Sequence, residues 1–306
     1  MHISVLLNET LKELDLKENS IVVDATLGYG GHSSEILKRI TKGHLYAFDQ
    51  DIDAINSSNK RLSEISNNYT IIKSNFQFLE KELNKIGINK VDRILFDIGV
   101  SSPQLDEADR GFSFHQDSTL DMRMDKDNPL TAKKIVNEYP YAKLAEIFNY
   151  YGEEKYASSI ARNIVKYRET KEINTTLELV EIIKKSVPDK YKREKHPARK
   201  VFQALRIEVN NELDVFESAL EQAINMLNVN GRVAVITFHS LEDRIAKEVF
   251  KKYTRIDEHL KNMPIIPDVY LPKYKVVATI EPSDNELEIN KRARSAKLRV
   301  IEKIKE

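Results

Sequence analysis

The residues best suited to chemistry lie in a short Gly-rich segment and at the end of the apolar run that follows it. The segment extends from Asp24 to His32 and reads Asp-Ala-Thr-Leu-Gly-Tyr-Gly-Gly-His, and Asp49 ends the next apolar run. Glycine lets the backbone turn tightly and approach a ligand closely. An acid in the position of Asp49 can accept both ribose hydroxyls of an adenosine-containing ligand. We therefore predict a nucleoside cofactor at this segment.

Two classes of cofactor compete for the Gly-rich segment. A nicotinamide dinucleotide fingerprint has the form G-x-G-x-x-G; Gly28 and Gly30 fit it, but Ser33 occupies the third glycine position. Asp24 precedes the turn, close to where a pyrophosphate would sit, and its charge suits the ammonium and sulfonium of S-adenosylmethionine better. The residues therefore favour S-adenosylmethionine, and a nicotinamide-dependent oxidoreductase remains the alternative.

The elements around this segment predict an α/β fold. Four apolar runs alternate with helical patterns in the first hundred residues: 21–23, 45–48, 69–72 and 93–98 as strands, and 33–40 and 52–62 as helices. Such alternation indicates βαβ units and a buried parallel sheet, whose ligands bind beyond the carboxyl ends of the strands. Asp24, Asp49 and Asp97 each stand at or near such an end.

The pattern is interrupted and then resumes. Residues 101–130 resemble a loop, and 131–187 are mostly helical, with a capping box at 175–178 that opens a helix through Ile183. The α/β pattern then continues with a helix whose apolar face spans 213–227, a turn at Asn230-Gly231 and a strand at 233–238. A helix opened by a cap at Ser240 and strands at 275–280 and 298–304 complete it. We expect a mostly parallel, Rossmann-like sheet closed by a C-terminal hairpin, formed by residues 1–110 and 205–306. Residues 111–204 would then be a loop and helical insertion domain.

The composition excludes several classes of protein. The 306 residues contain 41% hydrophobic residues, no cysteine, and 48 Lys or Arg against 48 Asp or Glu. A sizeable core is therefore expected, whereas disulfides, thiolate metal sites and a cysteine nucleophile are excluded. No apolar run approaches the roughly 18 residues of a membrane span, and the N-terminus carries acids that a secretory signal lacks. We expect a soluble cytoplasmic protein without a metal site or a membrane partner.

Many segments of the chain together carry a family resemblance. They are 2–9, 24–33, 97–106, 110–114, 120–125, 196–199, 202–207, 238–244 and 292–295. In this order they make the chain similar, almost end to end, to the family of small-subunit ribosomal RNA cytosine-N4 methyltransferases. The resemblance implies a class I adenosylmethionine-dependent methyltransferase whose helical insertion helps to bind RNA. It also implies cofactor contacts at Gly30, Gly31, His32, Asp49, Phe76, Asp97 and Gln104.

Methyl transfer to a cytosine amino group sets requirements that single out Asp97. The amino lone pair is delocalised into the ring, so acceptors for the amino hydrogens and in-line positioning both help. Many amino methyltransferases use an Asp/Asn/Ser-Pro-Pro-aromatic tetrapeptide after the fourth strand, but here Asp97-Ile-Gly-Val stands in its place. We predict that the Asp97 carboxylate, with backbone carbonyls, accepts these hydrogens. His239 is a second, minor catalytic candidate, while Asp121, Arg123 and Asp125 suit a structural salt bridge as well as a functional role.

Two basic runs in a neutral chain are candidate RNA contacts. Residues 184–200 hold eight Lys or Arg against two acids, and residues 291–306 hold seven against two. Phosphate binding needs such clusters, although a single charge run is usually only a solvated face. The aromatic side chains within the first run could stack on bases. For that run we predict RNA contacts by Lys192, Arg193, Lys195, His196 and Arg199.

The residues favour an S-adenosylmethionine-dependent enzyme, and the resemblance implies that it methylates the N4 amino group of a cytidine in small-subunit ribosomal RNA. A flipped or single-stranded cytosine is required, because the amino group is engaged in a paired helix. The alternative is a non-catalytic RNA-binding assembly factor on a methyltransferase scaffold. The sequence does not identify which cytidine is modified or whether the substrate is free RNA or the assembled small subunit. It also leaves open whether the protein is a monomer or a homodimer.

Overall fold

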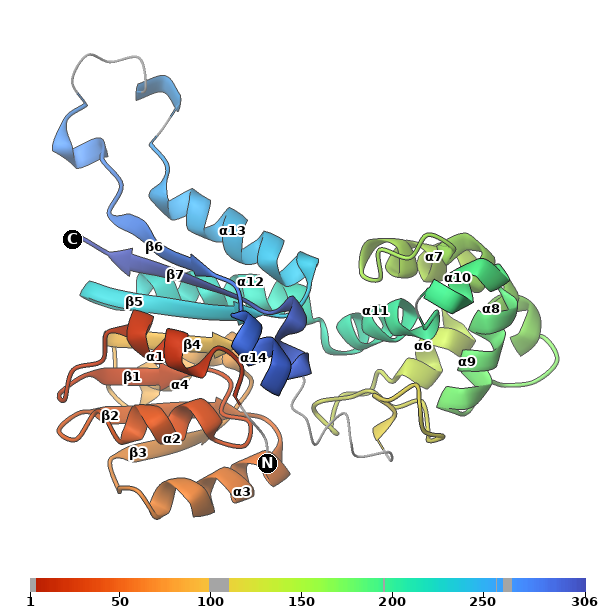
Figure 1. The fold of residues 1–306 in the computed structure, drawn as a ribbon, viewed down its shortest axis with the longest axis horizontal. Helices are drawn as coiled ribbons and strands as arrows, with labels where there is room; N and C mark the ends of the chain where they lie inside the picture. Colours follow the sequence, from red (N-terminus) through yellow and green to blue (C-terminus); the bar gives the residue numbers. More distant parts are fainter. Residues whose placement is uncertain (1–3, 99–109, 195, 257, 261–265) are drawn as a thin grey trace. The chain divides into compact units, whose positions relative to one another are not determined.

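The computed structural model describes residues 4–98, 110–194, 196–256, 258–260 and 266–306. The chain forms two compact units (Figure 1): Met1–Gly99 with Leu213–Glu306, called the sheet unit below, and Val100–Glu212, called the helical unit. The expected division placed residues 205–212 with the sheet. Instead, helix α11 (Ala198–Asn210) is continuous and buries Val201, Phe202, Leu205 and Val209 in the core of the helical unit.

A seven-stranded sheet organises the sheet unit, in the order β3-β2-β1-β4-β5-β7-β6. Strands β1 to β5 are parallel to their neighbours in this order, and β7 is antiparallel to both β5 and β6. The bounds are β1 (Ile21–Asp24), β2 (His44–Asp49), β3 (Tyr69–Lys73), β4 (Val91–Asp97), β5 (Leu227–Thr237), β6 (Tyr274–Ile280) and β7 (Lys297–Lys303). The predicted mostly parallel α/β sheet with a C-terminal antiparallel closure is thus confirmed.

Helices cover both faces of this sheet because its central strands are apolar on both sides. In β5, Val233 and Val235 belong to one core cluster and Ala234 and Ile236 to the other, as the two-residue period of a strand requires. The first face is covered by α4 (Leu79–Lys85), α12 (Glu212–Asn225) and α13 (Ser240–Thr254). The second face is covered by α1 (Leu7–Leu14), α2 (Gly31–Leu37), α3 (Ile52–Ser63) and the short helix η5 (Lys291–Ser295), which follows α14 (Asp284–Ile289).

Two local predictions in the second half of the sheet unit are wrong in detail. The predicted turn at Asn230-Gly231 lies inside β5, where Asn230 has a left-handed φ of 65° and the pairing with β4 shifts register. The turn residues therefore form an irregularity within a strand. The cap of α13 is His239 rather than Ser240, because the His239 side chain accepts from the backbone N–H of Glu242.

The helical unit contains six described helices around one core. They are α6 (Ala132–Glu138), α7 (Tyr141–Tyr150), α8 (Ala157–Arg168), α9 (Thr176–Lys185), α10 (Asp189–Glu194) and α11. The predicted capping box is confirmed, since Thr175 accepts from the N–H of Glu178 and the Glu178 side chain accepts from the N–H of Thr175. Among the described residues of both units, no helix is both long and apolar enough to cross a bilayer. The cytoplasmic location stays a prediction.

Candidate cofactor and catalytic site

Asp24 holds the Gly-rich turn between β1 and α2 in shape. Its Oδ2 accepts a 2.6 Å hydrogen bond from Ser33 Oγ, and its Oδ1 accepts one of 3.1 Å from the N–H of Thr26. The side chain is 1% exposed, and burial raises the pKa of Asp24 against the opposing effect of these hydrogen bonds. The sequence suggested Asp24 as a charge that favours a cationic cofactor. In the structure its two oxygens are used by the chain itself.

The glycines of this turn are needed for their backbone conformation. Gly28 and Gly30 have φ values of +50° and +74°, in the left-handed region that a side chain disfavours. A Cβ on Gly30 would also lie 3.3 Å from Ser58 Oγ, and a Cβ on Gly31 would collide with Ser4 Oγ. The turn therefore presents bare backbone at the N-terminus of α2.

Asp49 links the Gly-rich turn to the end of β2. Its Oδ2 accepts from the N–H of Gly28 and its Oδ1 from the N–H of Asp51, both at 2.8 Å. Burial raises the pKa of Asp49 to about 6, although these two backbone donors act in the opposite direction. Each carboxylate oxygen can accept a further hydrogen bond. Asp49 is thus a preorganised acceptor beside a Gly-rich turn, as ribose binding requires.

Phe76 and Gln104 complete the predicted cofactor contacts. Phe76 begins the short helix η1 (Phe76–Phe78) after β3, and its half-buried ring packs edge-on against Phe96 with centroids 5.8 Å apart. This packing fixes the ring on the same edge of the sheet as Asp49. Gln104 lies outside the described residues.

Asp97 is the carboxylate at the end of β4, and one of its oxygens makes no hydrogen bond to the part of the chain that the structure describes. Its backbone N–H donates to Thr26 Oγ1 at 2.7 Å, and its Oδ2 lies 3.3 Å from Nδ1 of His32. Its Oδ1 is buried and makes no hydrogen bond among the described residues. A buried carboxylate oxygen without a donor costs stability, roughly 1 to 3 kcal/mol, and such atoms are often kept for function. Among the described cofactor and catalytic candidates, this carboxylate oxygen and Nε2 of His239 are the buried polar atoms without a hydrogen bond.

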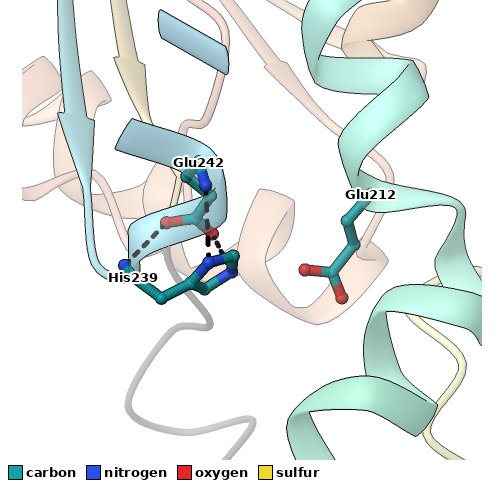
Figure 2. A group of neighbouring side chains, drawn as sticks. All are labelled: Glu212, His239 and Glu242. Atoms are coloured by element: carbon teal, nitrogen blue, oxygen red, sulfur yellow. Dashed lines mark hydrogen bonds and ion pairs between the residues drawn. The ribbon is translucent and has the colours of Figure 1, made fainter. Parts of the chain in front are cut away.

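His239, the minor catalytic candidate, has a structural role as the cap of α13 (Figure 2). Its Nδ1 accepts from the N–H of Glu242, and its Nε2 lies 2.9 Å from Glu242 Oε1. Glu242 Oε2 in turn accepts from the N–H groups of Phe238 and His239. The cap uses Nδ1 of His239, whereas its Nε2 is buried and makes no hydrogen bond among the described residues. A catalytic role for His239 stays a prediction. Glu212, also drawn in Figure 2, forms a bidentate pair with Arg206 within the helical unit.

The charged residues of the loop before α6 also form a structural pair. Arg123 binds both oxygens of Asp121, at 2.7 and 2.8 Å, and donates to the carbonyls of Lys126 and Asn128. The Asp125 carboxylate accepts from the N–H of Asp127. Of the two interpretations that the sequence allowed, these contacts favour the structural one.

The first basic run leaves several cations without partners. Lys192 pairs with Asp189 at 2.8 Å, and Lys184 pairs with Glu181 at the same distance. Within the described part of the chain, four exposed cations of this run have side chains that make no hydrogen bond or ion pair: Lys185, Lys190, Arg193 and Arg199. Lys195 lies outside the described residues. A surface of this kind offers charge to phosphates without first breaking internal pairs.

His196 belongs to an aromatic group at the edge of the helical unit's core. Its ring stacks on Phe114 with centroids 4.6 Å apart, and the His115 ring lies 5.4 Å away. Burial lowers the pKa of His196, and the nearby charges of His115 and Lys184 act in the same direction. One face of the His196 ring is thus already used within the protein.

The second basic run differs from the first because its cations are largely paired. Strand β7 places them beside acids of other elements: Lys297 with Glu281, Arg299 with Asp243, and Lys303 with Glu306. The run therefore contributes to holding the C-terminal strands. The second run was a candidate RNA contact on the basis of its charge alone. These ion pairs make it a weaker candidate, because the paired cations are already neutralised within the protein.

The sequence did not reveal how the N-terminal segment supports the site. Leu6 has a left-handed φ of 52°, and its N–H donates to Oε1 of Glu286 at 2.7 Å, which is 280 positions away in the chain. This arrangement places the Val5 carbonyl 3.2 Å from Nε2 of His32. No local pattern could predict a contact at that separation.

Comparisons with known proteins place the chain among methyltransferases. A model of the MraW methylase family matches residues 1–304. The chain is 14% identical to an rRNA methylase from Streptococcus thermophilus, over 98% of this chain and 93% of that one, with a TM-score of 0.43. It is also 14% identical to SMU.1697c from Streptococcus mutans, a structure in complex with SAH, over 99% of both chains, with a TM-score of 0.44.

Proposed function

Because the chain belongs to the MraW methylase family of S-adenosylmethionine-dependent ribosomal RNA methyltransferases, we propose that it methylates the N4 amino group of a cytidine in small-subunit RNA. The observation that carries this proposal is Oδ1 of Asp97 at the end of β4, which has no hydrogen-bond partner in the described ranges of the chain. An amino group presents N–H donors, and an ionised carboxylate oxygen is the strongest acceptor that a protein can offer them.

The residues at the carboxyl edge of the sheet fit S-adenosylmethionine. Asp49 offers carboxylate oxygens for the ribose hydroxyls, and Gly30 and Gly31 leave the backbone bare beside it. Phe76 holds an aromatic ring on the same edge, where an adenine face could lie against it. When bound, S-adenosylmethionine supplies an electrophilic methyl group on a sulfonium centre.

The residues of the chain then have separate tasks in the reaction. Asp97 Oδ1 accepts one amino hydrogen, which orients the nitrogen and restores electron density that the ring withdraws. Holding the nitrogen in line is worth up to about 7 to 11 kcal/mol at the ideal limit. The proton that the methylated nitrogen releases passes to Asp97 or to water. No strong base is required, so we assign His239 to capping α13.

We assign RNA binding to the helical unit. The exposed, unpaired cations Lys185, Lys190, Arg193 and Arg199 support this assignment, since phosphates bind through such groups. Lys192 contributes less than the sequence predicted, because it is half-buried and paired with Asp189. His196 and Phe114 together offer a ring edge for a base. The contact predicted at Lys195 stays a prediction.

Nucleoside mass spectrometry tests the proposed function. The full-length protein is incubated with methyl-labelled S-adenosylmethionine and either small-subunit RNA or assembled small subunits. We expect labelled N4-methylcytidine from at least one of these substrates. Binding to the RNA without any methyl transfer would instead indicate a non-catalytic assembly factor. Label in another nucleoside would overturn the assignment of N4.

A further inference from the structure

His32 is buried at the start of α2 with an oxygen at each ring nitrogen. Its side chain is 5% exposed, Nε2 lies 3.2 Å from the Val5 carbonyl, and Nδ1 lies 3.3 Å from Oδ2 of Asp97. A buried imidazole has no water to satisfy it, so these two oxygens determine where its protons lie. The contacts therefore specify the charge of the ring.

The proton count at the two nitrogens favours an imidazolium. The Val5 carbonyl can only accept, so Nε2 must carry a hydrogen. An ionised carboxylate also only accepts, so Nδ1 carries the second hydrogen toward Asp97. Burial alone would lower the pKa of His32, but the hydrogen bond to Asp97 and the charges of Asp97 and Asp24 outweigh it and raise the pKa.

The surroundings hold this pair in a fixed arrangement. The Val5 carbonyl is positioned by the bond from the N–H of Leu6 to Glu286, and the backbone of Asp97 is held by Thr26. Nδ1 of His32 lies beside Oδ2 of Asp97, and Oδ1 is buried without a donor from any described residue. A carboxylate that served only for packing would gain by satisfying both oxygens.

We propose that His32 is the positioning residue of the methyl transfer: as a buried imidazolium it binds Oδ2 of Asp97 and keeps Oδ1 available to the substrate amino group. This inference rests on the proposed function for its catalytic part. In the reaction, the N–C bond forms as the C–S bond breaks, and the amino proton leaves to Oδ1 and then to water. The imidazolium keeps both of its protons throughout.

The charge of His32 can be measured without any substrate. In the full-length protein at pH 7.5, the ring 15N resonances of His32, assigned by their loss in His32→Asn, should both show protonated nitrogens. An ordinary histidine, with a pKa of about 6.5, is mostly neutral at that pH. A neutral His32 ring at pH 7.5 would overturn the proposal. This readout stands even if the methylation of small-subunit RNA is not found, so the two proposals can fail separately.

Two substitutions of similar polarity test the positioning role. His32→Asn places an amide N–H where Nδ1 lies and keeps a donor toward Asp97, whereas His32→Gln keeps a donor only toward Val5. We expect kcat at saturating cofactor to be at least tenfold lower in His32→Gln than in His32→Asn. We also expect the wild-type kcat to decline at high pH as His32 loses its proton, and this decline to be absent in His32→Asn.

The controls separate positioning from folding and binding. His44 is half-buried in the same sheet, with Nε2 at 2.9 Å from Thr70 Oγ1, and His44→Gln should leave kcat unchanged. Thermal unfolding identifies variants that fail to fold. Equal kcat values for the two His32 variants would show that the donor to Asp97 is unimportant. A loss found only in the Kd for S-adenosylmethionine would restrict His32 to cofactor binding.

Discussion

The carboxyl edge of the sheet and the basic run of the helical unit present charge in opposite ways. At the edge, Asp24 and Asp49 accept hydrogen bonds from the chain at both oxygens, and one oxygen of Asp97 has no donor among the described residues. In the basic run, exposed cations such as Arg193 and Arg199 have no partner among the described residues. A preorganised edge suits one small ligand and one reacting group, whereas free surface cations suit a polyanion. Substitutions should therefore act locally and strongly at the edge, and weakly and additively in the run.

The largest effect is expected at Asp97. His32 donates toward this side chain, so the amide of Asp97→Asn would turn its oxygen to His32 and place NH₂ where Oδ1 accepts. We expect kcat to fall by about 10²- to 10³-fold at saturating cofactor, the range seen when one transition-state hydrogen bond is lost. Single-turnover assays measure this effect. Asp92 lies on the same strand and accepts from the N–H of Ile21, so Asp92→Asn is the matched control and should retain kcat.

Asp49→Ala should chiefly weaken cofactor binding. The change removes acceptors for the ribose and also the partner of the Gly28 N–H, so both the ligand contact and the turn are affected. We expect a loss of about 1.5 to 3 kcal/mol, or roughly 10- to 100-fold in the Kd for S-adenosylmethionine, by calorimetry. Asp53 is exposed in the first turn of α3, and Asp53→Ala should not change the Kd. An unchanged Kd in Asp49→Ala would remove Asp49 from the site.

Cofactor affinity should depend on pH through the same residue. Hydroxyl donors favour the ionised carboxylate, and the pKa of free Asp49 is about 6, so protons compete with the cofactor below that value. The Kd should be constant above about pH 7 and should rise up to about tenfold per pH unit below pH 6. Calorimetry at several pH values checks this. The dependence should be much flatter in Asp49→Asn, and an equal dependence there would assign the titration to another group.

The smallest single effects are expected in the basic run. Arg193→Ala and Arg199→Ala should each reduce the slope of log K against log salt for RNA binding by about 1, and the double variant by about 2. Lys297→Ala, in the paired second run, is the matched control and should leave the slope unchanged. Titrations of RNA at several salt concentrations measure the slopes. Equal slopes in all variants would show that the first run is only a solvated face.

The sequence predicted those features that depend on local pattern. Alternating apolar runs located the strands, and Asp49 and Asp97 were recognised because they end such runs. The capping box at Thr175 was also found, since its residues are three positions apart. Local pattern therefore placed these carboxylates at strand ends in a parallel sheet, whereas the contacts predicted at Gly31, Phe76 and Gln104 came from the family resemblance.

Features that depend on contacts between distant elements were not predictable. The pairing of Arg299 with Asp243 requires the antiparallel addition of β7, and the contact of Leu6 with Glu286 joins the two ends of the chain. The cap of α13 was predicted one residue late, at Ser240, because histidine is not a usual helix cap, although Glu242 three residues after His239 was a signal for a capping box. The vacant oxygen of Asp97 becomes visible only once His32 is placed beside it.

We assign cofactor binding to Asp49 and acceptance of the amino hydrogen to Asp97. The most direct test of these two roles compares Asp49→Ala and Asp97→Asn in one assay. Single-turnover formation of N4-methylcytidine in small-subunit RNA is followed while S-adenosylmethionine is raised to saturation. A pure binding defect is rescued by excess cofactor, whereas a defect in the chemical step persists. We predict that Asp49→Ala recovers a rate close to the wild-type rate and that Asp97→Asn does not. Full recovery by Asp97→Asn would contradict the assignment of Asp97 Oδ1 as the acceptor of the amino hydrogen.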